Sequence, residues 1–146
     1  MTAATERKSR VVPDYQAFLA SLELYTVALA EASCKINRDQ FWEKDTEHKN
    51  SYRITSRPVA LEDDYFEIRS TLTLNVTGRK ADLPLVRVVA SFDLHFHSPK
   101  VSKECVGKFC ESDVVLIVMP YFRELVTDVT ARMYIPPIIL PLSTKG

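Results

Sequence analysis

Apolar and polar residues alternate along two long segments in the middle of the chain. In the first, DYFEIRSTLTLNVTG, the even positions from 66 to 76 are apolar apart from one serine, and the odd positions are charged or polar. In the second, from Leu85 to about His97, the even positions are again apolar, and the odd positions include arginine, serine, aspartate and two histidines. A period of two is typical of a β-strand that buries one face. We therefore predict two amphipathic strands, joined by a turn at Gly78–Asp82.

The N-terminal part of the chain shows weaker patterns. After a PD dipeptide, aromatic and leucine side chains recur at helical spacing, which predicts a short helix ending at about Ser21. The segment Leu24–Ile36 predicts a strand, although its alanines favour helix. The segment Ser51–Leu61 predicts another strand, in which Pro58 restricts the later part to an edge or a bulge. We interpret the polar stretch between these two strands as a loop.

The C-terminal third combines helical patterns with prolines. The segment VSKECVGKFCES predicts a short helix or a turn, and an apolar run, DVVLIVMP, follows it. Pro120 suits the first position of a helix, where its missing N–H costs nothing, so we predict a helix from Pro120 to about Met133. Beyond it, three prolines keep the apolar run from Tyr134 to Leu142 extended. Such a stiff segment can cover the core or form one wall of a hydrophobic groove.

Together these elements predict an α+β fold. Consecutive strands with short connections favour a four-stranded antiparallel sheet, with a short N-terminal helix and a long C-terminal helix packed on its apolar face. A length of 146 residues fits one domain. We therefore predict a disordered tail at residues 1–12 and a single domain at residues 13–146.

Composition and charge exclude several classes of function. Lysine plus arginine and aspartate plus glutamate number 19 each, so no overall field attracts nucleic acid or a membrane. The sequence has neither GxGxxG nor GxxxxGK[ST], which are the common phosphate-binding loops. The polar N-terminus lacks the apolar segment of a signal peptide, and no apolar stretch is long enough to span a bilayer. We therefore expect a cytoplasmic protein, in which the three cysteines are thiols.

One cluster of side chains could carry chemistry. Asp93, His95 and His97 share a strand face, where paired histidines can chelate a metal, and Cys105 and Cys110 could complete a tetrahedral set. This leaves open a small metal- or thiol-dependent enzyme that uses Asp93, His95, His97 and Cys105. The alternative is that these side chains lie on the solvated face of a half-buried sheet. Because the Cys-x4-Cys spacing is unusual for zinc and no base is evident beside a cysteine, we favour a protein that is not an enzyme.

The C-terminal pattern resembles that of SecB, the cytosolic export chaperone. That family has a Tyr-x-Arg-Glu helix after a proline, followed by an arginine and an apolar run that contains proline. The residues of this chain that match the pattern are Pro120, Tyr121, Arg123, Glu124, Arg132, Pro136, Pro137 and Leu140. Upstream, DDYFEIRSTLTLNVTG resembles the third strand of the family and LYTVALAEASCKIN the first, so the resemblance covers roughly residues 22–142.

The resemblance implies an ATP-independent chaperone without a cofactor. Members of the family hold unfolded client chains in hydrophobic grooves and assemble as tetramers, built as dimers of dimers; neither nucleic acid nor membrane insertion is implied. On this basis we predict a client-binding groove and an oligomer interface, of a tetramer or a dimer. The groove comprises Phe41, Trp42, Tyr134, Ile135, Ile138 and Leu140. The interface comprises Phe122, Val126, Val129 and Met133.

Two departures from the family bear on the partner. The export chaperone presents acidic residues on its sheet to the SecA motor, whereas this chain has Arg87 in its fourth strand and mostly alanine in its first. We therefore consider docking to SecA doubtful. The leading helix, and an end at Gly146 without the family's further helix, are more similar to SecB-like chaperones that accompany toxin–antitoxin pairs. Exported preproteins, a dedicated antitoxin, and a scaffold role for one dedicated partner all stay open.

Overall fold

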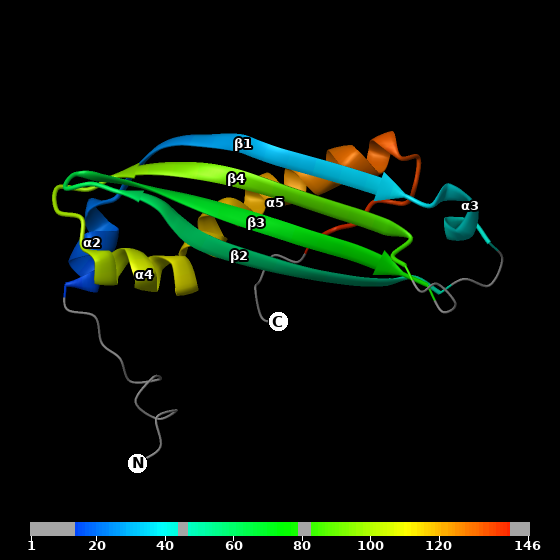
Figure 1. Cartoon of the computed structure of the whole chain (residues 1–146), viewed down its shortest axis with the longest axis horizontal. Coiled ribbons are helices and arrows are strands. Elements are labelled where there is room, and N and C mark those ends of the chain that lie inside the picture. The colour runs from blue at the N-terminus through cyan, green and yellow to red at the C-terminus, as the bar shows by residue number, and fades with distance from the viewer. Residues whose placement is uncertain (1–13, 44–46, 79–82, 141–146) are drawn as a thin grey trace, which may run out of the picture.

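The computed structural model describes residues 14–43, 47–78 and 83–140 (Figure 1). The four strands form one antiparallel sheet in the order β1-β4-β3-β2, with α2, α4 and α5 on one face. The strands are β1 (Glu23–Ile36), β2 (Lys49–Leu61), β3 (Tyr65–Thr77) and β4 (Val86–His97). The helices are α2 (Tyr15–Ser21), α3 (Arg38–Phe41), α4 (Lys103–Ser112) and α5 (Val114–Arg132). The predicted α+β fold is confirmed.

Three sequence-based expectations concern parts of the chain at or beyond these limits. The predicted tail at residues 1–12 and most of the predicted turn, at residues 79–82, lie outside the described residues. The prediction of a single domain at residues 13–146 stays a prediction. Within the described part of the chain, no helix is long and apolar enough to cross a membrane.

The two central strands carry the alternation that predicted them. Every even position of β3 is buried and every odd position is half-buried. β4 also buries every even position, and of its odd positions Ser91 is buried and Arg87 is exposed. The register sets Phe66 beside Phe96 and Leu72 beside Ala90, so the buried positions form one apolar surface under the helices. The opposite surface, which we call the outer face, carries the polar side chains.

The two edge strands differ from the central ones. β1 pairs with β4, is exposed at nearly every position, and has bulges at Tyr25 and Ala30. β2 pairs with β3 and has one bulge, directly after Pro58. Proline has no N–H to donate to a neighbouring strand, so an edge strand with a bulge accommodates it. The prediction that Pro58 lies at an edge or a bulge is confirmed.

An aromatic cluster joins the helices to the sheet. Phe66 and Phe96 stack with ring centroids 5.1 Å apart, and Phe109 of α4 meets both edge-on, at 6.1 and 5.2 Å. Phe18 of α2 stacks on Phe66 at 5.7 Å. All four rings are buried, and burial of such a side chain stabilises the fold by roughly 1.5 to 3 kcal/mol. This cluster therefore fixes α2 and α4 on the sheet.

The first turn of α2 is held by polar contacts. The hydroxyl of Tyr15 donates a hydrogen bond to a carboxylate oxygen of Asp113, between α4 and α5. The amine of Lys108 lies 4.5 Å from the centre of the Tyr15 ring. Burial, together with the hydrogen bond to Asp113, raises the pKa of Tyr15 to about 12. The phenol therefore stays protonated, and keeps donating to Asp113, throughout the neutral range.

α5 begins at Val114 rather than at Pro120, so the predicted start of this helix was wrong. The preceding apolar run is helical because Val114, Val118 and Met119 are buried in the core. An interior proline removes a backbone hydrogen bond and costs about 3 kcal/mol. Burial of three such side chains stabilises by roughly 1.5 to 3 kcal/mol each, which outweighs that cost. The proline itself lies on the exposed side of the helix.

Two further segments form short helices. The predicted loop between β1 and β2 contains α3, so the loop prediction was wrong at Arg38–Phe41. Asn37 caps this helix by accepting a hydrogen bond from the backbone N–H of Gln40 at 3.2 Å. The segment predicted as helix or turn forms α4, where the Ser102 hydroxyl accepts from the backbone N–H of Cys105 at 3.4 Å. Both caps satisfy N–H groups that have no partner inside the helix.

The chain reverses direction at the end of α5. Tyr134 is left-handed (φ 56°) and its N–H donates to the carbonyl of Ala131 at 3.1 Å. The N–H of Ile135 donates to the carbonyl of Thr130 at 3.4 Å. This pair of bonds is a Schellman motif, which ends a helix and satisfies its last carbonyls.

The segment that follows, residues 135–140, covers the core and is called the C-terminal segment below. It runs back beside α5 on the side facing β2 (Figure 1). The Nε of Arg123 donates to the carbonyl of Leu140 at 3.3 Å, which ties the segment to the helix. Ile135, Ile138 and Leu140 are buried. Of the two roles predicted for this run, covering the core is the one these side chains take; residues 141 and 142 lie outside the described part.

Candidate functional site

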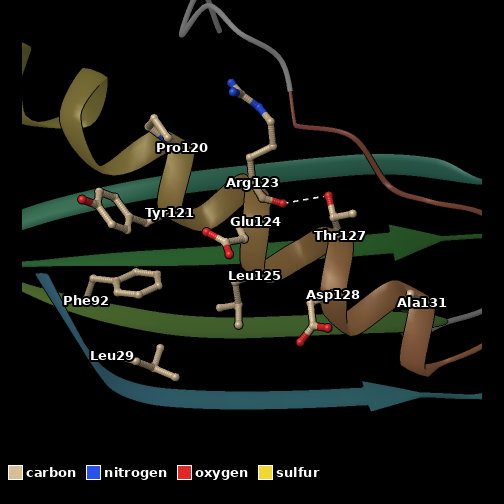
Figure 2. Close-up of a pocket in the computed structure, with 10 residues that line it drawn as sticks. All are labelled: Leu29, Phe92, Pro120, Tyr121, Arg123, Glu124, Leu125, Thr127, Asp128 and Ala131. Atoms are coloured by element: carbon tan, nitrogen blue, oxygen red, sulfur yellow. Dashed lines mark hydrogen bonds between the residues drawn. The ribbon is translucent and has the colours of Figure 1, made fainter.

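A groove of about 870 Å³ lies between α5 and the edge strand β1 (Figure 2). Its floor is made by Leu29 of β1 and Phe92 of β4, which are cross-strand neighbours on the helix-covered face of the sheet. Its wall is the side of α5 that faces β1, from Pro120 to Ala131. The ring of Tyr121 lies above the floor, with its centroid 6.0 Å from that of Phe92.

The floor of this groove is apolar because β1 extends beyond the helical layer. Phe92 is 9% exposed and packs edge-on against Phe122 of α5, at 5.2 Å between centroids. Leu29, directly beside it, is 51% exposed. α5 therefore covers the sheet as far as β4 and leaves an apolar side chain of β1 open to solvent.

A second hollow, of about 340 Å³, repeats this arrangement near the start of β1. Leu24 pairs with Phe96 there, as Leu29 pairs with Phe92 in the first groove. Leu116 of α5 lines the hollow, and both Leu24 and Leu116 are largely exposed, at 41% and 59%. Both hollows follow the boundary between β1 and α5, and together we call them the β1–α5 groove.

An open sheet edge adjoins the β1–α5 groove. β1 is the last strand on its side of the sheet, so its outward backbone groups face no further strand in the described residues. It is 14 residues long and carries three charged side chains, Glu23, Glu31 and Lys35. An edge of this kind can accept an added strand, because unpaired N–H and C=O groups bind the backbone of any sequence.

The rim of the groove on α5 is acidic. Glu124 and Asp128 lie one turn apart on the side that faces β1 (Figure 2). Asp128 accepts a hydrogen bond from the Nε of Arg132 at 3.2 Å, in an exposed pair. Arg123 extends the opposite way, toward the C-terminal segment, and Thr127 donates to its carbonyl at 2.9 Å within the helix. The groove thus combines an apolar floor with negative charge at its rim.

The six residues predicted to form a client-binding groove do not gather at one open surface. Phe41, Ile135, Ile138 and Leu140 are buried in the core, between 2% and 7% exposed. The Schellman turn directs the C-terminal segment back over the sheet, so Ile135, Ile138 and Leu140 face inward, whereas Phe41 is buried from α3. These four side chains are buried in the described protomer, and their part in client binding stays a prediction. Trp42 and Tyr134 are 55% and 82% exposed, and their part in client binding stays a prediction.

The side chains predicted to form an oligomer interface also lie inside the protomer. Phe122 and Val126 are fully buried, Met133 is nearly so, and Val129 is partly buried against the core. The apolar stripe of α5 therefore packs on this chain's own sheet, which leaves Phe122 and Val126 no surface for a partner. The dimer or tetramer expected from the sequence stays a prediction.

The structure separates the candidate metal and thiol residues. Asp93 accepts two hydrogen bonds from Arg69, at 2.7 and 2.9 Å, and this pairing lowers the pKa of Asp93. The rings of His95 and His97 stack on the outer face, 5.4 Å apart. Cys105 is buried in the core, on the other face of the sheet. The four residues form no common site, which corrects the alternative of an enzyme built on them; the described residues hold no group of three potential metal ligands.

The thiol of Cys110 is not set up as a nucleophile. Burial, with a smaller effect from Glu111, raises the pKa of Cys110 to about 11. A cysteine attacks as the thiolate, and reactive cysteines have lowered pKa values. Cys110 therefore stays protonated in the neutral range.

Sequence reasoning did not identify the residues that line the β1–α5 groove. Leu24 and Leu29 resemble ordinary buried strand positions, and Leu116 belongs to an apolar run. The sequence signal that could have identified them is the alanine content of β1. A strand with few large side chains is poorly suited to a fully buried position in the sheet.

No protein-family model matches this sequence, and no curated protein matches it either. Among solved structures, the chain is similar to the SecB-like chaperone Rv1957 of Mycobacterium tuberculosis, solved in complex with a ChAD peptide from the antitoxin HigA1 (Rv1956). The TM-score is 0.68 at 18% sequence identity, over 88% of this chain and 98% of that one. A protein of unknown function from Streptococcus agalactiae aligns with a TM-score of 0.49 and 9% identity, over 82% and 96% of the two chains. The predicted SecB-like fold is confirmed.

Proposed function

We propose that this chain is an ATP-independent chaperone that holds extended apolar segments of unfolded client proteins in the β1–α5 groove. The observation that carries the proposal is an open strand edge directly beside an apolar groove. We propose further that the chain acts in the cytoplasm, without a cofactor, and as a dimer or a dimer of dimers.

Binding would use backbone and side chains for different purposes. A client segment added to β1 gains hydrogen bonds that do not depend on its sequence. Alternate side chains of the added strand then point toward Leu24 and Leu29 and are removed from water. Because unpaired strands and exposed apolar surface are what make unfolded chains aggregate, covering both would keep a client dispersed.

The similar structure bears on the kind of client. Rv1957 is a SecB-like chaperone solved with a peptide from an antitoxin. We propose an aggregation-prone antitoxin as one client of this chain and exported preproteins as the alternative, with SecA docking doubtful. The same observation favours a second candidate function, a scaffold that binds one dedicated partner and no general clients.

The test compares two pairs of exposed apolar residues. Leu24→Ser/Leu29→Ser changes the groove side of β1, and Val59→Ser/Ile139→Ser changes side chains that do not line the groove and are 44% and 75% exposed. Light scattering would follow aggregation of a chemically unfolded test protein at increasing amounts of each variant. We expect the first variant to need about thirtyfold more chain for equal protection, since each of the two leucines loses roughly 1 kcal/mol of burial and about 1.4 kcal/mol is a factor of ten. The second variant should match the wild type.

Three results would speak against a general chaperone. Absence of protection by the wild type at stoichiometric excess would reject it, as would equal loss in both variants. Tight binding of a single antitoxin peptide, weakened by Leu24→Ser/Leu29→Ser but without protection of the test protein, would instead support the dedicated scaffold.

A further inference from the structure

The outer face of the sheet carries a group of cations, from the middle of the strands to the end that adjoins α3, away from the β1–α5 groove. The pairing register gathers five exposed lysine and arginine side chains from three strands of this face. We call them the basic platform: Lys35, Lys49, Arg53, Arg57 and Arg87. Among the described residues, helices cover only the opposite face of the sheet, so no described helix lies over the platform (Figure 1).

Several of these cations lie beside each other across strands. Lys35 of β1 is paired with Arg87 of β4, and Arg57 of β2 is paired with Arg69 of β3. Like charges directly opposite each other destabilise a sheet. In the second pair Arg69 is already neutralised by Asp93. The pair of Lys35 and Arg87 has no such carboxylate, and a bound anion would relieve it.

The carboxylate of Asp93 interacts with the charge of Arg57, and it leaves the other four platform cations unneutralised. Arg87 donates to the side-chain oxygen of Asn75 at 3.4 Å, which is a neutral partner. Asp93 is engaged by Arg69 at 2.7 and 2.9 Å. Consider the outer-face positions of β3 from residue 73 onward and the residues paired with them on the other three strands. Apart from the cations, these positions hold serine, threonine, asparagine and valine, so none of them is a carboxylate. No platform residue has an ion pair within the described part of the chain.

We propose that the basic platform docks an acidic segment of a partner protein. Lys49, Arg53 and Arg57 follow one another at every fourth residue of β2, about 13 Å apart along the strand. An extended segment lying along β2 with acidic residues at the same interval sets one carboxylate against each cation. The hydroxyls of Ser51 and Thr55 lie between the cations on the same face and can donate to the remaining carboxylate oxygens.

A protein fits this platform better than nucleic acid does. The whole chain is neutral, with 19 basic and 19 acidic residues and an isoelectric point near 6.8. Nucleic-acid-binding domains are usually strongly basic, and stable binding commonly neutralises about 6 to 10 phosphates. Five cations on a neutral chain suit a short acidic peptide.

The experiment uses the full chain and a fluorescein-labelled peptide with glutamate at every fourth position and serine and glycine between. Fluorescence anisotropy would measure its affinity for the wild type, for Arg53→Gln/Arg57→Gln, and for Lys100→Gln/Lys103→Gln, which removes the same charge outside the platform. We expect the first variant to bind about five- to tenfold more weakly and the second to change less than about twofold. Binding should also weaken as sodium chloride rises from about 50 to about 200 mM.

Three outcomes would overturn the proposal. The first is that the glutamate peptide does not bind, and the second is that both variants lose affinity for it equally. The third is that a single-stranded oligonucleotide of equal charge binds more tightly than the peptide, which would assign the platform to nucleic acid. Arg53→Gln/Arg57→Gln should retain full protection of an unfolded test protein, because the β1–α5 groove lies on the other face. Failure of the peptide experiment therefore does not contradict the proposed chaperone function. Failure of the protection experiment likewise does not contradict the proposed docking of an acidic segment.

Discussion

The two edge strands of the sheet have nearly the same length, yet they are covered differently. On the helix side of β1, Leu24 and Leu29 are about half exposed. On the helix side of β2, Tyr52 and Ile54 are partly buried against the core. α4 contacts β2, and the C-terminal segment lies on the same side of α5 (Figure 1). One edge of the sheet is therefore closed by the chain itself, and the other is open.

This difference shows which edge is protected from unwanted pairing. Both edge strands have bulges and charged side chains, but only β2 also has a proline, Pro58, and a row of three exposed cations, Lys49, Arg53 and Arg57, which discourage the addition of another strand. β1 has no proline, and its outer-face positions include Ala28 and the small polar residues Thr26 and Ser33. The less protected edge is also the one beside an apolar groove, which is why we propose binding at β1.

A lysine on the helix side should affect the two edges differently. Ile54→Lys places a charge against the core, and we expect it to lower the free energy of unfolding by about 2 to 3 kcal/mol. Leu29→Lys enters the open groove, and we expect a change below about 0.5 kcal/mol together with loss of client protection. Denaturant unfolding measures both effects. Equal destabilisation by the two substitutions would mean that β1 is covered as well as β2.

The turn that sends the C-terminal segment toward β2 can be strengthened. The left-handed conformation of Tyr134 is strained by about 1 kcal/mol relative to glycine, and its side chain is 82% exposed, so little packing depends on it. We expect Tyr134→Gly to raise the free energy of unfolding by about 0.5 to 1 kcal/mol in thermal or denaturant unfolding. Tyr134→Ala is the control, because alanine keeps the strain and should give no gain.

The smallest expected change in the free energy of unfolding concerns the ion pair of Arg69 on β3 with Asp93 on β4, between the two edge strands. Arg69 lowers the pKa of Asp93 below the ordinary value of about 3.9. The stability from this pair is fully present above about pH 4 and is lost as the pH falls through the lower pKa of the folded state. Asp93→Asn should therefore be less stable at pH 6, and denaturant unfolding curves should converge with the wild type toward about pH 2.

Both side chains of this pair are partly exposed, which keeps the effect modest. A stability difference between Asp93→Asn and the wild type that stays constant from pH 6 to about pH 2 would show that packing, rather than charge, is responsible.

The central sheet could be predicted because its strands bury one face completely. The alternation from Phe66 to Val76 appears as strict burial in β3, and the same holds for most of β4. In such strands the alternation of apolar and polar residues in the sequence matches the alternation of buried and half-buried positions in the fold, so the sequence pattern predicts the burial. The resemblance of the C-terminal motif to SecB then predicted how the long helix packs on the four-stranded sheet.

Other features depend on contacts that no local pattern contains. Pro120 obeys the rule for the start of a helix, but packing of Val118 and Met119 extends the helix past it. The stripe through Phe122 indicates a buried face without stating whether the chain's own sheet or a partner covers it. The exposure of Leu29 follows from the sheet order, which places β1 beside β4 and at an edge.

The bulges at Tyr25 and Ala30 also bear on how long a client stays bound. They divide β1 into two regular stretches, Thr26–Leu29 and Glu31–Ile36. A bulge interrupts the ladder of hydrogen bonds and increases the local twist. A strand added to this edge therefore forms short runs of consecutive bonds instead of one long ladder. If this edge holds a client as proposed, each run would open separately, and release would proceed in steps with small barriers and without an energy source.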